Sequence, residues 1–132
     1  MGLATAYWCV LIAALLPYVW VAIAKGSGER YDNRDPRGWV ARQDNPRVLR
    51  ANAAQLNGYE AFAPFAAGVV FAQLAGVAAD RIAWLAGLFV IFRILHGLIY
   101  ISGWQPALRS LIWAAAFVCV VILFVQAALQ VA

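Results

Sequence analysis

Polar side chains that could bind a ligand or take part in catalysis lie inside otherwise apolar stretches of this sequence. The set comprises Arg50, Asn57, Glu60, Arg93, His96, Tyr100, Arg109 and Ser110. Ionisable groups are costly within a membrane, so they usually face the protein interior and mark functional sites. Arginines, a histidine and a tyrosine around a single carboxylate leave an excess of hydrogen-bond donors. This excess predicts a site for an anionic ligand, and a carboxylate-bearing molecule would satisfy it.

The spacing of these residues places them on two helix faces. Arg50 and Asn57 are separated by about 20° around a helix, and Glu60 lies about 60° further round. A second run has the i, i+3, i+7 spacing of one helical stripe and consists of Arg93, His96 and Tyr100. We therefore expect two polar helix faces to meet inside the protein.

Glu60 and Arg93 are expected at similar depth in the membrane. Glu60 lies about 20 Å along a helix from Arg47, and Arg93 lies about 15 Å along the next helix from Gly103. Consecutive helices are antiparallel, so both distances start from the same surface. We expect Glu60 to be ionised, buried and paired with Arg93 or a neighbouring polar residue, because an isolated buried charge is destabilising. An ion pair that only fixes the helix register is the alternative.

The elements that carry these residues are predicted to be membrane helices. The chain has 132 residues, of which 65% are apolar and 12% charged, and its mean hydropathy is +0.76. About 20 apolar residues span the hydrocarbon core of a bilayer. Four stretches qualify, residues 3–24, 48–79, 82–103 and 107–132. The predicted fold class is all-α: an integral membrane four-helix bundle that forms one domain over residues 1–132.

Turn-forming residues predict where these helices begin and end. Pro46 is expected to begin the second helix, and Asp80 and Arg81 to form a tight turn after it. Gly103 begins a second turn, and Pro106 suits the first position of the last helix. The loop over residues 25–46, rich in Gly, Pro, Asp and Asn, is the one long connection.

The basic residues predict the orientation of the chain in the membrane. Seven of the ten lie between Lys25 and Arg50, in and beside the first loop. Loops rich in Lys and Arg stay in the cytoplasm. We therefore expect the first loop to be cytoplasmic and both termini to lie on the opposite side.

Composition also argues against two classes of function. Four acidic residues are interspersed with the arginines of the first loop, so the chain lacks the continuous basic face of a nucleic-acid-binding protein. Cys9 and Cys119 each lie in an apolar run with no clustered ligands. They are expected to be small buried hydrophobic residues rather than part of a disulfide or a metal site.

Small residues on the second helix allow another helix to approach closely. Gly68, Ala72 and Gly76 follow one another at intervals of four residues. Such stripes are typical of helix contacts in membranes. The stripe favours self-association of the chain.

The motifs of the second and third helices resemble those of the MAPEG family, the membrane-associated proteins in eicosanoid and glutathione metabolism. Arg50-Ala51 precedes an Asn-x-x-Glu run, which begins at Asn57 and ends at Glu60. The later residues are similar to the prostaglandin E synthase branch in type and spacing, namely Arg93, His96, Tyr100, Arg109 and Ser110. The chain is similar to a bacterial-type member over nearly its whole length. Ala53 stands where the eukaryotic enzymes have an arginine four residues before the Asn.

The resemblance implies a homotrimer that binds glutathione, as a thiol cosubstrate, between subunits in the cytoplasmic half of a bacterial inner membrane. It implies a transferase or peroxidase that acts on lipophilic electrophiles or hydroperoxides. Arg109 would stabilise the thiolate, helped by the N-terminus of its helix, and Ser110 would donate a hydrogen bond to the same sulfur. The remaining polar residues would bind the peptide, namely Arg50, Asn57, Glu60, Arg93, His96 and Tyr100.

Two other functions agree with the same residues. The chain could be a non-catalytic membrane protein that serves as a small subunit or assembly partner of a larger complex. It could also bind a lipid or a quinone-like ligand between its helices. Binding of glutathione would discriminate between these functions and the enzyme.

Overall fold

The computed structural model describes residues 2–132, which form helices and no strand. Its elements are α1 (Leu3–Ser27), α2 (Pro36–Ala41), α3 (Pro46–Leu74), α4 (Ala79–Ser102) and α5 (Pro106–Gln130). The predicted all-α class is therefore confirmed.

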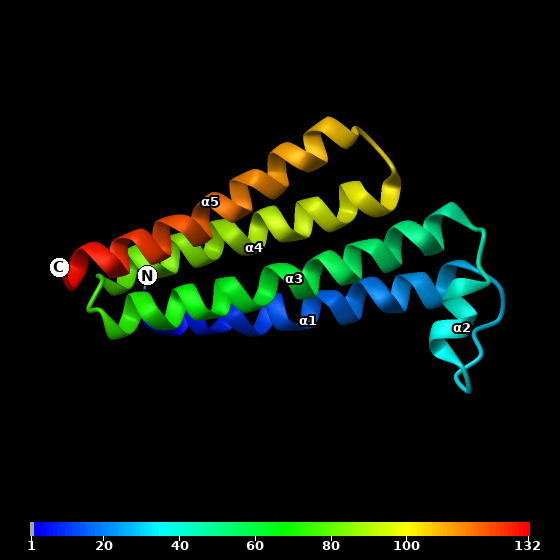
Figure 1. Cartoon of the computed structure of the whole chain (residues 1–132), viewed down its shortest axis with the longest axis horizontal. Helices are drawn as coiled ribbons and strands as arrows, with labels where there is room; N and C mark the ends of the chain where they lie inside the picture. The colour runs from blue at the N-terminus through cyan, green and yellow to red at the C-terminus, as the bar shows by residue number, and fades with distance from the viewer. Residues whose placement is uncertain (1) are drawn as a thin grey trace.

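The four long helices lie side by side (Figure 1), and the short α2 packs against α3. Helix α3 packs against α1, α4 and α5, and α4 packs against α1 and α5. Both termini lie at one end of the molecule and α2 lies at the other (Figure 1). At the end where α4 connects to α5, α5 diverges from the other helices (Figure 1).

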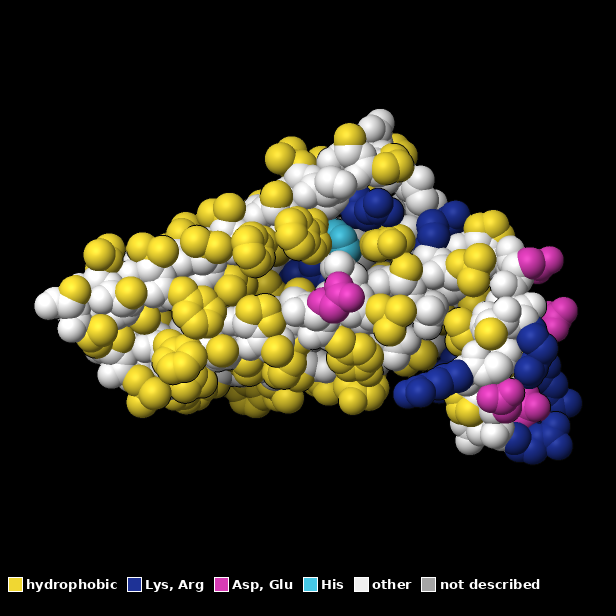
Figure 2. Space-filling view, in the orientation of Figure 1, with side chains coloured by type: hydrophobic (Ala, Val, Ile, Leu, Met, Phe, Trp, Pro, Cys, Tyr) yellow, Lys and Arg dark blue, Asp and Glu magenta, His cyan; other side chains and the backbone are white. Residues whose placement is uncertain are grey.

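Three of the long helices, α1, α4 and α5, are long and apolar enough to cross a membrane. Their outer faces carry exposed large apolar side chains such as Leu11, Leu88 and Leu111, and hydrophobic side chains dominate the surface in Figure 2. These helices have the length and composition that are typical of an integral membrane protein. Helix α3 is more polar because it contains residues such as Glu60 and Gln73, so a fourth membrane span stays a prediction.

Helix α3 ends earlier than its apolar stretch predicted, at Leu74 rather than residue 79. Gly76 adopts a left-handed conformation with φ of 82°. The Val77 N–H donates to the Ala72 carbonyl, and the Gly76 N–H donates to the Gln73 carbonyl. This is the Schellman arrangement that ends many helices. The predicted turn at Asp80 and Arg81 is accordingly wrong, because both residues lie in the first turn of α4.

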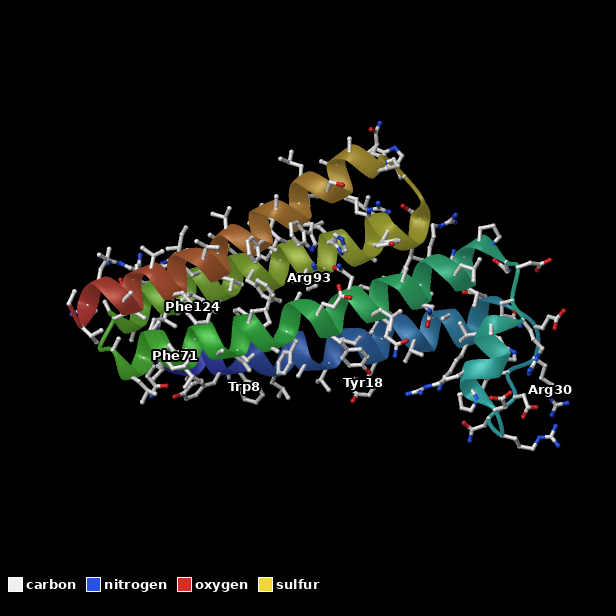
Figure 3. All side chains as sticks on the ribbon, in the orientation of Figure 1. Trp8, Tyr18, Arg30, Phe71, Arg93 and Phe124 are labelled. Carbon is white, nitrogen blue, oxygen red and sulfur yellow. The ribbon has the colours of Figure 1, made fainter. Side chains whose placement is uncertain are left out.

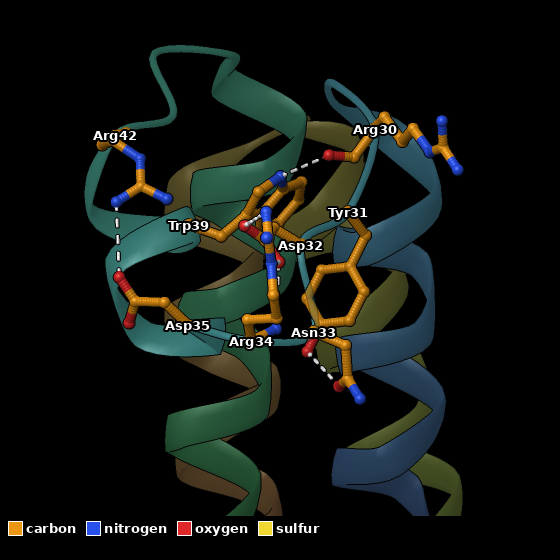
Figure 4. A network of polar contacts seen from close by, with 8 residues as sticks. All are labelled: Arg30, Tyr31, Asp32, Asn33, Arg34, Asp35, Trp39 and Arg42. Atoms are coloured by element: carbon orange, nitrogen blue, oxygen red, sulfur yellow. Dashed lines mark hydrogen bonds and ion pairs between the residues drawn. The ribbon is translucent and has the colours of Figure 1, made fainter.

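The first loop contains a short helix that the sequence reading did not include. Helix α1 continues to Ser27, and α2 begins after Asp35, whose side chain accepts a hydrogen bond of 3.0 Å from the Gly38 N–H. An Asp followed by Pro is a helix-start signal and could have revealed α2. Figure 4 shows the surrounding contacts, including the Trp39 indole donating to the Arg30 carbonyl at 3.2 Å.

The other predicted turn has the expected form. Gly103 caps α4 in the left-handed conformation with φ of 73°, and Pro106 occupies the first turn of α5. The cysteines also behave as predicted, since Cys9 and Cys119 are both free and buried. They belong to the larger apolar core, in which Phe65 and Phe89 stack with ring centroids 3.8 Å apart.

Candidate functional site

A cavity of about 230 Å³ opens between α3, α4 and α5, near the loop that joins α4 to α5. Its lining consists of Asn57, His96, Tyr100, Arg109, Ser110 and Trp113. The structure thus brings five of the eight predicted residues together in one place. Asn57 comes from α3, His96 and Tyr100 come from α4, and Arg109 belongs to the first turn of α5.

Aromatic contacts hold the basic side chain of this cavity. The Arg109 guanidinium lies over the Tyr100 ring, 4.2 Å from its centroid. The Tyr100 ring meets the imidazole of His96 edge to face, with centroids 5.6 Å apart. Arg109 therefore has a fixed position at the N-terminal end of α5, where the helix dipole adds to its positive charge.

His96 has hydrogen-bonding capacity left over. The residue is only 3% exposed, and its Nδ1 has no hydrogen-bond partner within residues 2–132. Buried polar atoms are almost always paired with protein, water or ligand. The Nδ1 of His96 therefore has unused hydrogen-bonding capacity beside the cavity that His96 lines.

Arg93 pairs with Asn57 and not with Glu60. Its Nη2 donates to the Asn57 Oδ1 at 2.7 Å, and Arg93 is only 5% exposed. Glu60 is exposed and forms no ion pair within residues 2–132, so the predicted buried Glu60–Arg93 pair is wrong. Asn57 and Glu60 lie about 60° apart on the helix, and that rotation turns the amide rather than the carboxylate toward α4.

Glu60 and Arg93 nevertheless lie near each other, at a second cavity. Glu60 and Arg93 both line this smaller space, which lies between α3, α4 and α5. Figure 3 labels Arg93 in the middle of the long helices, and Figure 2 shows basic and acidic side chains beside the one histidine, with hydrophobic side chains around them. Glu60 is thus near the polar cluster but not bonded to it.

Arg50 and Ser110 already have backbone partners. The Arg50 Nε donates to the Ile101 carbonyl at 2.9 Å, at the C-terminal end of α4. The Ser110 hydroxyl donates to the Pro106 carbonyl at 3.2 Å in its own helix. Arg50 lies outside the cavity lining, whereas Ser110 belongs to it.

Helix α1 packs against α3 and α4 behind the site, at two positions where these helices have glycine. Gly58 follows Asn57, and a Cβ added to it would lie 3.0 Å from Pro17. Gly97 follows His96, and a Cβ added to it would overlap the Trp20 ring. These close contacts fix the helix positions that present Asn57 and His96 to the cavity.

Sequence reasoning missed Trp113 and the contacts of α1 as parts of the site. Trp113 lies within the last apolar stretch and lines both cavities. Its place four residues after Arg109 is a signal that could have found it, because residues i and i+4 share a helix face.

The electrostatics of the cavity favour an anion. Its lining contains Arg109 and no acidic residue, and buried Arg93 lies next to it through Asn57. Within residues 2–132, no group of three or more His, Cys, Asp or Glu side chains is placed to hold a metal ion. The arrangement can hold a negatively charged group against a guanidinium and a helix N-terminus.

Comparison with known proteins gives one match. The family model described as MAPEG family matches residues 5–129. No curated protein and no solved structure matches the chain.

Proposed function

The chain belongs to the MAPEG family, and from that premise we propose that it is a membrane-bound enzyme with glutathione as its thiol cosubstrate. Its second substrate is a lipophilic electrophile or hydroperoxide. The observation that carries the proposal is the cavity that Arg109, held over Tyr100, lines together with buried His96, whose Nδ1 has no hydrogen-bond partner within residues 2–132. A cationic and partly desolvated site favours the thiolate form of a thiol.

The residues of the cavity suit different groups of glutathione. Arg109 and the N-terminus of α5 stabilise the thiolate, and Ser110 can donate to the same sulfur if its hydroxyl leaves the Pro106 carbonyl. His96 and Asn57 offer polar contacts to the peptide. Glu60, exposed beside the cluster, suits the ammonium group of the ligand.

Three further residues are assigned from the same geometry. Arg93 holds Asn57 in position and adds positive charge behind the cavity, and Tyr100 positions Arg109. Arg50 lies outside the lining and is bound to the Ile101 carbonyl. We therefore assign Arg50 to the stability of α4 rather than to ligand binding.

The reaction needs no resident metal or cofactor in this proposal. In the transferase reaction, the thiolate sulfur bonds to the electrophilic carbon, the leaving group departs with its electron pair, and the thiol proton passes to solvent. In the peroxidase reaction, two glutathione molecules are oxidised to a disulfide while the hydroperoxide is reduced to an alcohol and water. Both reactions depend on the thiolate, so both need Arg109.

We propose that α3 is the fourth membrane span and that residues 1–132 form a single domain. Helix α3 packs against all three apolar helices, which shield its polar residues from lipid. We also propose that the basic first loop lies in the cytoplasm of a bacterium, that both termini lie across the inner membrane, and that the chain forms a homotrimer.

Titration of the detergent-solubilised protein with glutathione tests the function. Wild type should bind glutathione at up to millimolar concentration and develop the ultraviolet absorbance of a thiolate. Arg109→Ala should lose that absorbance and lower turnover at saturating glutathione by about 100-fold, because a group that stabilises developing charge is removed. Arg109→Lys should keep part of both signals.

Arg81→Ala is the matched control, since Arg81 lies in the first turn of α4 at the opposite end of the molecule. It should behave as wild type. If wild type binds no glutathione, or if Arg109→Ala keeps full turnover and thiolate absorbance, the catalytic proposal fails. The role of a small subunit or assembly partner would then be the better explanation.

A further inference from the structure

A second cavity of about 110 Å³ lies beside the polar one along α5. Its apolar lining includes Pro64, Phe89, Trp113, Ala116, Phe117 and Val120. Trp113 belongs to both cavities. On α5, Arg109, Trp113, Ala116 and Val120 follow helical spacing along one face. The two cavities therefore lie next to each other along α5, with Arg109 at one end and Val120 about 16 Å further along the helix.

The inner end of this second cavity is buried and its outer edge is accessible. Phe89, Ala116 and Val120 are at most 4% exposed, and Phe89 stacks on Phe65. Trp113 and Phe117 are 42% and 48% exposed and stack on each other with centroids 5.5 Å apart. A molecule dissolved in the bilayer can thus reach the cavity past one aromatic wall.

The volume limits what the cavity can hold. An apolar cavity of about 150 Å³ in another protein stays dry and binds benzene. A space of about 110 Å³ accordingly suits one aromatic ring or a short alkyl chain, and not a long acyl chain. Because this cavity adjoins the one that contains Arg109, the reactive carbon of such a molecule would lie near the proposed thiolate.

The charged groups at the cavity disfavour ligands that carry a carboxylate. Glu60 contributes an exposed carboxylate to its wall, and Arg93 already donates to Asn57. The charges of Glu60 and Arg93 act on a substrate carboxylate in opposite senses, and the rest of the lining is apolar. A carboxylate would therefore lose its hydration there with little net gain, so the cavity favours neutral molecules.

We propose, as an extension that rests on the proposed function, that this cavity holds the apolar end of the second substrate. It selects neutral electrophiles with a single ring or a short alkyl chain. Ala116, Phe89 and Val120 set the size limit at its inner end, and Trp113 guides the reactive carbon toward Arg109.

Kinetics with 1-chloro-2,4-dinitrobenzene test this selection. In that reaction the carbon–sulfur bond forms, chloride leaves with the electron pair, and the thiol proton passes to solvent. Ala116→Leu should fill the cavity and raise KM for the aryl chloride at least tenfold, with the affinity for glutathione and the thiolate absorbance unchanged. Reaction with iodomethane, which has no ring to seat, should change by less than twofold.

Two other variants keep the test informative if Ala116→Leu folds poorly. Ala114→Leu adds the same side chain at an exposed position of the same helix and should leave both substrates unaffected. Val120→Ala enlarges the inner end and should lower KM for a two-ring or longer-chain electrophile relative to the one-ring compound. Unchanged KM ratios in both cavity variants, with glutathione binding intact, would overturn the inference and leave the proposed function standing.

Direct binding separates this inference from the enzyme activity. The aryl chloride should quench the fluorescence of Trp113 when it binds beside this residue. The component of the quenching that is lost in Trp113→Phe therefore reports binding at this site. Wild type and Ala114→Leu should show that component at low concentration, and Ala116→Leu should show it only at concentrations at least tenfold higher. If glutathione does not bind, the proposed function fails, but the quenching measurement still decides whether the cavity accepts the ring. Equal quenching in wild type, Ala116→Leu and Trp113→Phe would mean that the cavity does not accept it.

Discussion

Arg93 is a deeply buried charge between the long helices, and Asn57 is its hydrogen-bond partner within residues 2–132. A neutral amide accepts a hydrogen bond from the guanidinium without the desolvation of a second ion. Glu60 thereby stays exposed and available to a ligand. The residue that stabilises the buried arginine and the residue that offers a negative charge are therefore different residues.

Replacing Asn57 by Ala should destabilise the protein by about 1–3 kcal/mol, because the buried Arg93 loses its acceptor. Glu60→Gln should change the free energy of unfolding much less, since Glu60 has no ion pair within residues 2–132. Denaturant unfolding of both variants in the same detergent gives the comparison. A larger loss for Glu60→Gln than for Asn57→Ala would mean that the carboxylate, and not the amide, stabilises Arg93.

At the scale of elements, helix α1 determines how closely α3 and α4 can be held. Its Pro17 and Trp20 contact the two helices where these have glycine, at Gly58 and Gly97. No larger residue fits at Gly97 without displacement of Trp20. The orientation of His96, the neighbour of Gly97, thus depends on a helix that contributes no residue to the cavity lining.

Gly97→Ala should destabilise the protein by about 1–3 kcal/mol, because the added methyl group overlaps the Trp20 ring. Gly87→Ala is the matched control in the same helix, since a Cβ at Gly87 meets nothing within 4 Å. It should be neutral or stabilising by up to about 1 kcal/mol. Thermal unfolding of the two variants measures the difference, and equal stability would mean that α1 does not press on α4 at this point.

Gly76→Ala should destabilise the end of α3 by about 1–2 kcal/mol, because φ of 82° is strained for a residue with a Cβ. Gly26→Ala is the control, a helical glycine with open space around it. Hydrogen exchange of the last turn of α3 should increase only in the Gly76 variant. If both variants exchange alike, the left-handed cap does not hold this helix end.

At the scale of the whole molecule, the small-residue stripe of α3 is used within the chain. A Cβ at Gly68 would lie 3.3 Å from Leu123 of α5, Ala72 is completely buried, and Gly76 lies beyond the end of the helix. The stripe therefore no longer supports contact between copies. The expectation of a trimer depends on the family resemblance and on the apolar outer faces.

Mass measurement in mild detergent should give a closed assembly of three copies, because every copy makes the same contacts in a closed symmetric assembly. Gly68→Leu should weaken the contact of α3 with α5 and lower stability without changing the number of copies, since Gly68 packs inside the chain. A monodisperse monomer of wild type would contradict the trimer. If Gly68→Leu changes the number of copies, the small-residue stripe does take part in contacts between copies.

Local features of the sequence determined the helices, because hydropathy over about 20 residues and turn residues such as Pro106 act over short distances. They also determined that Arg93, His96 and Tyr100 share one helix face, since helical periodicity is fixed by backbone geometry. The family followed from the same motifs and is confirmed by the match over residues 5–129.

The partners across helices were decided by the tertiary structure. A rotation of about 60° about a helix axis exchanges Asn57 for Glu60 opposite Arg93, and that rotation depends on packing against Pro17 and Trp20. Sequence periodicity fixes relative positions on one helix but not the rotation of that helix against its neighbours. For this reason the polar residues could be named from the sequence, whereas their pairing and the second cavity beside Trp113 required the assembled helices.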